Sequence, residues 1–164
     1  MRIAILTISD AGSRGERHDG SGNAIAEWCS ARGAELTARA LIPDDVTAIA
    51  TQLIEWCDAD AADLVLTTGG TGLAPRDVTP EATRVVLERE APGIAERIRA
   101  LSLERFPRAA LARGLAGVRA RTLIINLPGS TGGVRDGLAA LEPIIEHAVA
   151  ITRGEQTEHG GTAP

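Results

Sequence analysis

The sequence predicts an α/β fold in which helices cover both faces of a mostly parallel β-sheet. Short apolar runs of strand length alternate with amphipathic runs of helix length along most of the chain, which is typical of such sheets. Only three aromatic side chains occur, Trp28, Trp56 and Phe106, so Leu, Ile, Val and Ala must fill the core, as in other covered parallel sheets. The 164 residues are enough for one domain and too few for two.

Three strands and two helices are predicted in the first half of the chain. The strands comprise residues 2–8, 35–42 and 63–68. The second strand alternates between apolar and polar residues, which indicates an edge or half-exposed strand. After a polar loop at residues 11–20, one helix starts at Ser21 and ends at Gly33. The other starts where either Asp44 or Asp45 provides the cap.

Helices dominate the second half. They are predicted at residues 79–90, 94–103, 107–113 (one or two turns only) and 134–152. Thr79 is the expected N-cap of the first of these helices, with Pro80 at its first position. Residues 122–127 form a strongly apolar strand, preceded by a short pairing strand near Val118. Gly154 closes the last helix.

The chain is predicted to form one domain over residues 1–154, followed by a polar tail at residues 155–164 that is expected to be disordered. No apolar run approaches the ~20 residues of a membrane span, and the N-terminus lacks the features of a signal peptide. We therefore expect a cytoplasmic protein with no membrane partner. Cys29 and Cys57 have no neighbouring Cys or His and are expected to be buried free thiols.

The charged residues exclude several classes of function. The net charge is −5, which argues against a nucleic-acid binder that depends on phosphate contacts. All 17 basic residues are Arg. Because the chain contains no Lys, it cannot carry a Walker P-loop, a Schiff-base site or a lysyl-AMP intermediate. The three histidines show no metal-ligand or Ser-His-Asp spacing and are expected to have surface or packing roles.

Chemically useful residues follow the predicted strands and should meet at the carboxyl edge of the sheet, where ligands bind in α/β folds. The segments concerned are Ser9-Asp10, Pro43-Asp44, Gly69–Gly72 and Asn126–Ser130. The glycines can adopt positive φ and bring main-chain N–H groups close to a phosphate or to the edge of a pterin or purine. The alternative is a strand-to-helix turn that needs glycines only for its shape.

Two aspartates near the glycine segment suggest a cation site. Because Thr79 can cap the following helix, the carboxylate of Asp77 is free to bind a cation, whereas Arg76 beside it could form a plain surface ion pair. Asp44 could instead be an ordinary N-cap. Mg²⁺ binds one or two protein carboxylates together with substrate phosphates, so two carboxylates next to a phosphate-binding loop suit Mg²⁺-assisted phosphoryl chemistry.

One long segment, Thr67–Ala82 (TTGGTGLAPRDVTPEA), points to a family. It resembles the signature of the molybdopterin-binding family, which includes bacterial molybdopterin adenylyltransferases and the matching G domains of plant and animal molybdenum-insertion proteins such as gephyrin. Further matching segments occur in the same order over nearly all of residues 1–152. They are ILTISD at the start, DGSG at 19–22, LIPDD at 41–45, PGIAERIRALSL at 92–103 and LIINLPGS at 123–130.

The resemblance implies a three-layer αβα fold with a mixed sheet, assembled as a homotrimer. It implies an enzyme that transfers AMP from ATP to the terminal phosphate of molybdopterin, assisted by Mg²⁺, with release of pyrophosphate. A downstream molybdate-insertion protein is the implied partner. We expect the molybdopterin phosphate oxygen to attack the α-phosphorus of ATP in line, without a covalent enzyme intermediate.

The resemblance also assigns roles to individual residues. Asp44 and Asp77 match the family's catalytic, Mg²⁺-associated aspartates, and Ser102 matches a serine at the pterin site. The other residues expected to bind substrate or nucleotide are Ser9, Asp10, Gly69, Gly70, Thr71, Gly72, Arg76, Asn126, Pro128, Gly129 and Ser130. One position departs from the family. Ala112 stands where the family often has the Ser of a Leu-Ser-Arg run, so a hydroxyl associated with pterin binding is missing.

Other functions are compatible with the same resemblance. A related bacterial subgroup binds molybdopterin but has no established catalytic capacity, and the intact RDVTPEA run at residues 76–82 favours the enzyme over this binder. A similar domain occurs fused to a nicotinamide-nucleotide amidase. We expect no amidase activity here, because 164 residues leave no room for that second half. A purely structural module is the remaining alternative.

Overall fold

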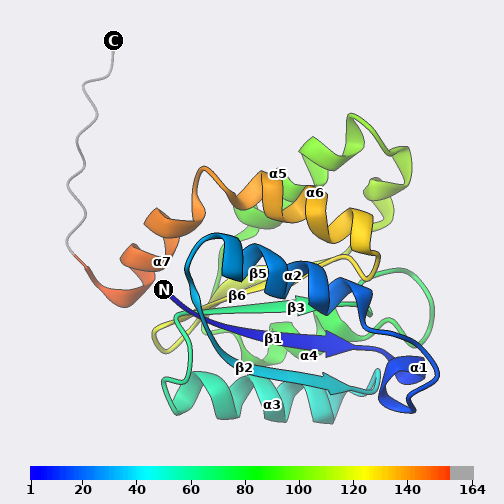
Figure 1. The fold of residues 1–164 in the computed structure, drawn as a ribbon, viewed down its shortest axis with the longest axis horizontal. Helices are drawn as coiled ribbons and strands as arrows, with labels where there is room; N and C mark the ends of the chain where they lie inside the picture. Colours follow the sequence, from blue (N-terminus) through cyan, green and yellow to red (C-terminus); the bar gives the residue numbers. More distant parts are fainter. Residues whose placement is uncertain (156–164) are drawn as a thin grey trace.

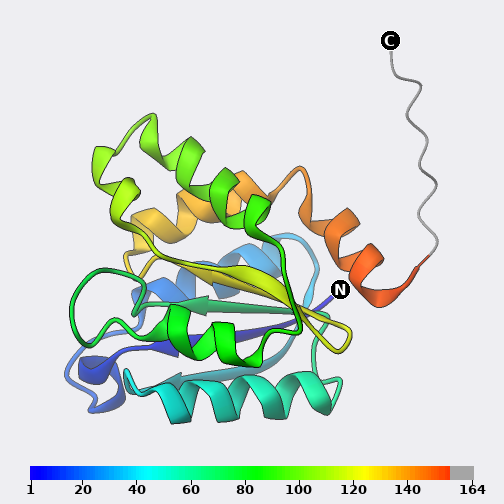
Figure 2. The ribbon, with the colours of Figure 1, turned by 180° about the vertical axis from the view of Figure 1, so that it is seen from behind.

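The structure is a computed structural model that describes residues 1–155, which form a mixed six-stranded sheet between two layers of helices (Figures 1 and 2). The strand order is β2-β1-β3-β6-β5-β4. The four parallel strands are β1 (Arg2–Ile8), β2 (Glu35–Ile42), β3 (Leu64–Thr68) and β6 (Thr122–Leu127). The two antiparallel strands are β5 (Ala116–Arg119) and β4 (Arg89–Glu90). The predicted three-layer αβα fold with a mixed sheet is confirmed.

The helices divide between the two faces of the sheet. One face is covered by α2 (Gly20–Ala31), α5 (Pro92–Leu103), α6 (Thr131–Leu141) and α7 (Ile145–Arg153). The other face is covered by α3 (Val46–Asp58) and α4 (Thr79–Val86). Two short elements complete the described part of the chain, α1 (Asp10–Ser13) and the 3-10 helix η1 (Pro107–Leu111).

The apolar core lies on both faces, because successive side chains of each strand point to opposite sides. In β1, for example, Ile3 packs with α2 and α5–α7, whereas Ala4 packs with α3 and α4. The central strands are therefore mainly apolar, as is usual in parallel sheets. Cys29 and Cys57 are buried free thiols, one in each core, as predicted, and burial raises the pKa of each to about 11.

Two further expectations concern a membrane span and the tail of the chain. Within residues 1–155, no helix is both long enough and apolar enough to cross a membrane. The tail predicted to be disordered begins at Glu155, and the rest of it, residues 156–164, lies outside the described residues.

The helix predicted at residues 79–90 is shorter than expected. It ends at Val86, and Arg89 and Glu90 form β4, which pairs with β5. The chain turns at Leu87 into an extended conformation, and the N–H of Glu88 then donates to the Val118 carbonyl (2.9 Å). In the sequence, the charged residues Arg89 and Glu90 look like a continuation of the helix. Only their pairing with β5 shows that they form a strand.

The prediction of one long helix at residues 134–152 is wrong, because two helices occupy this part of the chain. α6 starts earlier, with Ser130 as its N-cap, and ends at Leu141. α7 begins at Ile145, after a break that contains Pro143. Proline lacks the N–H that an interior helix position donates, and its ring clashes with the preceding turn, so the helix divides here. Gly154 closes α7 with a positive φ of 76°, as predicted.

The loop predicted at residues 11–20 contains a short helix. Ser9 starts α1 by accepting a hydrogen bond from the Gly12 N–H at its side chain (3.1 Å). α2 begins one residue earlier than predicted, at Gly20, because Asp19 caps it by accepting from the Gly22 N–H (2.8 Å). Both caps lie at the carboxyl edge of the sheet.

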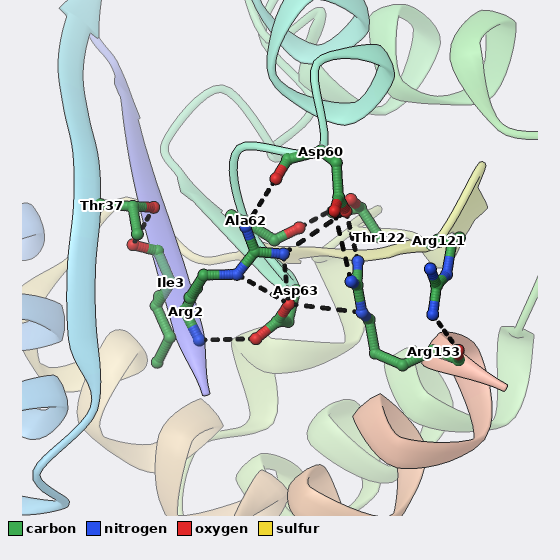
Figure 3. Close-up of polar contacts among 9 residues, drawn as sticks. All are labelled: Arg2, Ile3, Thr37, Asp60, Ala62, Asp63, Arg121, Thr122 and Arg153. Atoms are coloured by element: carbon green, nitrogen blue, oxygen red, sulfur yellow. Dashed lines mark hydrogen bonds and ion pairs between the residues drawn. The ribbon is translucent and has the colours of Figure 1, made fainter. Parts of the chain in front are cut away.

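Ion pairs at the opposite edge of the sheet fasten α7 to the start of β1 (Figure 3). Asp63 accepts hydrogen bonds from the main-chain N–H of Arg2 (2.7 Å) and from its Nη2 (2.8 Å). Arg153 of α7 pairs with both Asp60 and Asp63. Burial raises the pKa of Asp63, but Arg2 and Arg153 outweigh this effect and hold it below the ordinary value. These carboxylates remain ionised and stabilise the edge away from the candidate site.

Candidate active site

The carboxyl ends of β1, β3 and β6 surround a cavity of about 400 Å³. Seven of the residues singled out in the sequence line it: Ser9, Asp44, Gly69, Gly70, Asp77, Gly129 and Ser130. They come from five separate segments of the chain. These segments therefore meet at one edge of the sheet, as expected, and half of the fourteen predicted site residues line this cavity.

Asp44 has a carboxylate that no helix requires. Asp45, and not Asp44, caps α3 by accepting a hydrogen bond from the Ala48 N–H (2.8 Å). Asp44 is instead joined to Asp10 in both directions. Its Oδ2 accepts from the Asp10 N–H (2.8 Å), and its own N–H donates to Asp10 Oδ1 (3.0 Å). This pair of bonds fixes Asp44 at the cavity wall.

The environment of Asp44 disfavours its negative charge. Burial raises the pKa of this carboxyl, the hydrogen bond from the Asp10 N–H opposes that rise, and the charges of Asp10 and Asp77 add to it. The pKa therefore lies above its ordinary value of 3.8. A cation next to Asp44 would lower the free-energy cost of ionising this carboxyl, since an opposite charge favours the ionised form.

Asp44→Asn is therefore expected to raise the melting temperature of the protein at neutral pH in the presence of EDTA. A carboxyl whose pKa is raised by folding costs stability once the pH exceeds that pKa, and the cost vanishes below the unfolded pKa. The gain should thus be largest near pH 7 and disappear below about pH 3, where the carboxyl is protonated in both the folded and the unfolded state. Thermal denaturation at several pH values measures it, and an equal loss of stability at every pH would contradict it.

Gly69 and Gly70 shape the cavity floor, and their backbone conformations need glycine. Their φ angles are +102° and +61°. A Cβ at Gly69 would lie 2.1 Å from the Ile8 carbonyl oxygen, and one at Gly70 would lie 2.8 Å from Asp44 Oδ1. Gly69 thus fits the alternative of a turn that needs glycine only for its shape, because it lets β3 turn close to β1. The bare Cα of Gly70 leaves room beside the Asp44 carboxylate.

Thr79 is not the N-cap predicted from the sequence. α4 already includes Thr79, and Val78 at the cap position makes no side-chain hydrogen bond. The Thr79 hydroxyl donates instead to the Gly69 carbonyl (2.9 Å), so it holds the glycine segment against the start of α4. A threonine before Pro looks like a cap in sequence, but here its side chain faces back into the fold.

Asp77 is free of helix capping, as predicted, although for a different reason. Its Oδ2 accepts a hydrogen bond from the Ala74 N–H (2.8 Å), which closes a tight turn. Within residues 1–155, no donor reaches Oδ1 of Asp77 or Oδ1 of Asp44. Each carboxylate thus keeps one oxygen available at the cavity.

Arg76 and Asp10 form an ion pair outside the cavity lining. The Arg76 guanidinium donates two hydrogen bonds to the Asp10 carboxylate (2.9 and 2.8 Å). This contact lowers the pKa of Asp10. The side chain of Arg76 is 64% exposed. Arg76 therefore forms a surface ion pair, which was the alternative to a role in ligand binding. The pair links the loop before α4 to α1.

Asn126 lies away from the cavity. It is buried in the sheet, where its Nδ2 donates to Thr67 Oγ1 (2.9 Å) and Thr83 Oγ1 (3.0 Å). Its Oδ1 accepts from the Leu115 N–H (3.1 Å). These bonds use the amide to join β3, β6 and α4, so the side chain supports the sheet and does not face the cavity. Thr71 is also buried and absent from the cavity wall.

A second cavity of about 450 Å³ lies next to the first, and Ser130 lines both. Its wall is mainly apolar and carries three arginines. The lining residues are Ile98, Arg99, Ser102, Arg105, Phe106, Arg108, Ala109, Ala112, Pro128, Ser130, Gly132, Gly133 and Asp136. Ser102, Pro128 and Ala112 are thus grouped here, separate from the two aspartates.

Several residues of the first cavity were not predicted from the sequence. Arg17 and His18, which are exposed, line it, as do Asp19 and the first turns of α2 and α6. Asp19 accepts hydrogen bonds from the Thr7 hydroxyl (2.9 Å) and from Arg39 (2.7 Å). The DGSG segment signalled a helix start at this place, but only the fold shows that it reaches the same cavity as the glycine segment.

The donor set is one that suits Mg²⁺ better than a transition metal. Among residues 1–155, no group of three or more His, Cys, Asp or Glu side chains is arranged to hold a metal ion. Asp44 and Asp77 offer two carboxylates and no nitrogen or sulfur. Mg²⁺ is held by one or two carboxylates with substrate phosphates and water as the remaining ligands, so this pair fits it.

Known proteins resemble this chain over most of its length. The family model described as "Probable molybdopterin binding domain" matches residues 4–147. The chain is 41% identical over 160 residues to a molybdopterin adenylyltransferase of Helicobacter pylori (strain J99), which covers 94% of this chain and 89% of that protein. It is 41% identical over 145 residues to the molybdopterin adenylyltransferase of Escherichia coli (strain K12), which covers 87% and 74%.

The fold agrees with the sequence matches. A crystal structure of the molybdopterin biosynthesis enzyme MoaB from Thermus thermophilus is 51% identical, with a TM-score of 0.89 over 94% of this chain and 97% of that one. The family model, the relatives and the solved structure thus lead to the same conclusion. The chain belongs to the molybdopterin-binding domain family.

Proposed function

We propose that this protein is a molybdopterin adenylyltransferase of molybdenum cofactor biosynthesis, which transfers AMP from ATP to the terminal phosphate of molybdopterin. The observation that carries the proposal is the placement of Asp44 and Asp77 in one cavity at the carboxyl edge of the sheet, with Asp44 beside Gly70 and Asp77 beside Gly72. Two relatives at 41% identity bear the name of this activity, and the chain covers most of each.

The first cavity is suited to the triphosphate of ATP in spite of the net charge of −5. Its wall includes Gly20, Ser21 and Thr131, which are the first residues of α2 and α6. The N-terminus of a helix carries partial positive charge and free N–H groups, so it attracts phosphates. Arg17 adds a full positive charge to the wall. Asp19, Asp44 and Asp77 add three carboxylates to the same wall, so binding of the triphosphate would also need a cation at Asp44 and Asp77 to offset their charge.

Asp44 and Asp77 would hold the Mg²⁺ that accompanies ATP. When bound, this ion would neutralise charge on the phosphate oxygens and favour departure of pyrophosphate. Among the described residues, no donor reaches one oxygen of each carboxylate, and the pKa of Asp44 is raised by burial, so both would gain from a cation.

The second cavity is the proposed site of the pterin. Its apolar wall suits a flat ring system, and Arg99, Arg105 and Arg108 suit the anionic groups of molybdopterin. Because Ser130 lines both cavities, a molybdopterin phosphate at their junction would lie close to the α-phosphorus of ATP in the first cavity. The phosphate oxygen would attack this phosphorus as the bond to pyrophosphate breaks, and the protein would contribute alignment and charge neutralisation.

Ala112→Ser is expected to lower the KM for molybdopterin by about two- to tenfold, the range expected for one added hydrogen bond. Ala112 lines the pterin cavity and is half-buried, so a hydroxyl at this position can reach a ligand. Ala110→Ser is the control, because Ala110 lies nearby in η1, is exposed and lines neither cavity, so this variant should keep the wild-type KM. Steady-state kinetics at saturating ATP measure both variants, and a KM that is unchanged or raised in Ala112→Ser contradicts the assignment.

The proposal is tested by incubating the protein with molybdopterin, Mg²⁺ and ATP labelled at either the α- or the γ-phosphorus. The α-label should appear in a pterin product whose mass has increased by one adenylyl group, and the γ-label should appear in pyrophosphate. Folded protein that binds both ligands but transfers no label would disprove the proposed activity.

Binding without turnover is the second candidate function. It is retained because the structure that is 51% identical is described as the molybdopterin biosynthesis enzyme MoaB, and that description does not specify adenylyl transfer. The labelling experiment separates the two functions, because a binder retains ATP intact. The homotrimer, the molybdate-insertion partner and the cytoplasmic location remain predictions, the first of which analytical ultracentrifugation can test.

A further inference from the structure

We propose that Arg113 is a positioning residue that clamps the loop between Gly72 and Asp77, and so holds the Asp77 carboxylate at the first cavity. The inference rests on the proposed function, because it assigns the clamp to the reaction that Asp77 serves. Arg113 lines neither cavity, so it acts through the loop and not by touching substrate.

The contacts of Arg113 reach both ends of the loop. Its Nε donates to the Gly72 carbonyl (2.7 Å), and its Nη2 donates to the Asp77 carbonyl (2.5 Å). Its main-chain N–H donates to the Thr71 carbonyl (2.9 Å), just before the loop. One residue from a distant part of the chain therefore fixes three carbonyl groups of the glycine and aspartate segment.

Glu81 orients the guanidinium for this task. Its carboxylate accepts hydrogen bonds from Nη1 and Nη2 of Arg113 and lies in the first turn of α4. The contact with Arg113 lowers the pKa of Glu81, so the carboxylate is ionised at neutral pH. A planar guanidinium can serve these acceptors together, whereas a Lys ammonium at the end of a flexible stem cannot match the same geometry.

Within residues 1–155, little else holds the loop besides two bonds from Thr79, one from its hydroxyl to the Gly69 carbonyl (2.9 Å) and one from its N–H to the Gly70 carbonyl (3.0 Å). Leu73 to Arg76 are all exposed and belong to no helix or strand. The bond from the Ala74 N–H to Asp77 lies within the loop itself, so it closes the turn without fixing its place on the protein. The Arg76–Asp10 pair is largely exposed to solvent and is expected to contribute little. Arg113 is two-thirds buried and supplies the main anchor.

The test compares Arg113→Ala and Arg113→Lys with Arg119→Ala. Arg119 is a matched control, since it also joins a carboxylate, Asp58, to a main-chain carbonyl, that of Val86, but lies outside both cavities. Two quantities are measured for each variant. One is the Mg²⁺ concentration that gives half-maximal adenylyl transfer, and the other is the rise in melting temperature produced by Mg²⁺ and ATP without molybdopterin.

Arg113→Ala is expected to raise the half-saturating Mg²⁺ concentration by about 10- to 100-fold, as loss of a group that supports a metal ligand does. The rise in melting temperature on adding Mg²⁺ and ATP should shrink, and millimolar guanidinium should partly restore activity. Arg113→Lys should recover only part of the loss. Arg119→Ala should lower the melting temperature while leaving the Mg²⁺ dependence unchanged.

Other results would overturn the clamp. One is a wild-type Mg²⁺ dependence in Arg113→Ala, and another is an equal shift in Arg119→Ala. If Arg113→Ala does not fold, Glu81→Gln replaces it and should raise the Mg²⁺ requirement by a smaller factor, whereas no change would count against the proposal. Wild-type protein that forms no product refutes the proposed activity alone, because the melting-temperature measurement still reports on the clamp.

Discussion

Asp77→Asn is expected to slow the formation of adenylylated molybdopterin by about a hundredfold or more, and Asp44→Asn is expected to have a similar effect. Asn keeps the size of the side chain but removes the charge that would hold Mg²⁺. Both carboxylates line the cavity, and each has one oxygen that receives no hydrogen bond from the part of the chain that the structure describes. A hundredfold loss corresponds to about 2.7 kcal/mol of transition-state stabilisation. Continuous assay of pyrophosphate release measures it.

Asp45→Asn is the control for this pair of variants. Asp45 follows Asp44 directly, lies outside the cavity lining, and caps α3. Asn is as good an N-cap as Asp, so this variant should keep both its stability and its activity. If Asp44→Asn or Asp77→Asn released pyrophosphate within about threefold of the wild-type rate, a difference below ~1 kcal/mol, the assignment of these residues would be wrong.

The arrangement of the strands could be predicted from the sequence because burial on both faces leaves a strong local signal. β1, β3 and β6 are mainly apolar runs, and each is followed within two residues by a polar residue or a glycine. That pattern was sufficient to predict which edge would carry the candidate site. β4 could not be predicted, since its two residues are exposed and charged and are defined only by pairing with β5.

Individual side-chain roles were harder to predict, because they depend on partners far away in the sequence. The sequence could not decide between Asp44 and Asp45 as the cap of α3, and the structure decides it through the Ala48 N–H. Asn126 looked like a site residue, being the polar member of an apolar strand next to a turn. Its amide is instead used inside the sheet, by Thr67 and Thr83.

The anchors of the site loops left even less trace in the sequence. Arg113 is separated from the Asp77 carbonyl by 36 positions, and Arg76 from Asp10 by 66. With 17 arginines in the chain, no local pattern marks which of them are paired with main-chain carbonyls. Only the packed structure shows that the conformation of the glycine and aspartate segment is held from outside.

Gly69→Ala is expected to lower the free energy of unfolding by about 3 kcal/mol or more, because two separate penalties combine at this position. The φ angle of +102° is one that side chains other than glycine rarely adopt, and the new Cβ would lie 2.1 Å from the Ile8 carbonyl oxygen. That oxygen belongs to the backbone of a central strand and cannot move aside cheaply. For a domain of this size the loss corresponds to a fall of about 6–12 °C in melting temperature.

Gly93→Ala is the matched control for this variant. Gly93 lies in the first turn of α5, has no atom within 4 Å of the position of an added Cβ, and is exposed. Alanine favours a helix over glycine by up to ~1 kcal/mol, so this variant should be as stable as wild type or more so. Differential scanning calorimetry compares the two. A melting temperature of Gly69→Ala within about 2 °C of that of Gly93→Ala would contradict the prediction. It would mean that β1 and β3 can move apart to relieve the clash at little cost in free energy.

Gly69→Ala should also impair the site beyond its effect on stability. The Gly69 carbonyl accepts the Thr79 hydroxyl, and Gly70 next to it faces Asp44. Any shift that relieves the clash with Ile8 must therefore displace the glycine segment, which lies against Asp44 at Gly70 and against Asp77 at Gly72. The folded fraction of the variant is expected to show a weaker rise in melting temperature with Mg²⁺ and ATP than Gly93→Ala. Equal rises would mean that the close approach of Gly69 to β1 is needed for folding alone.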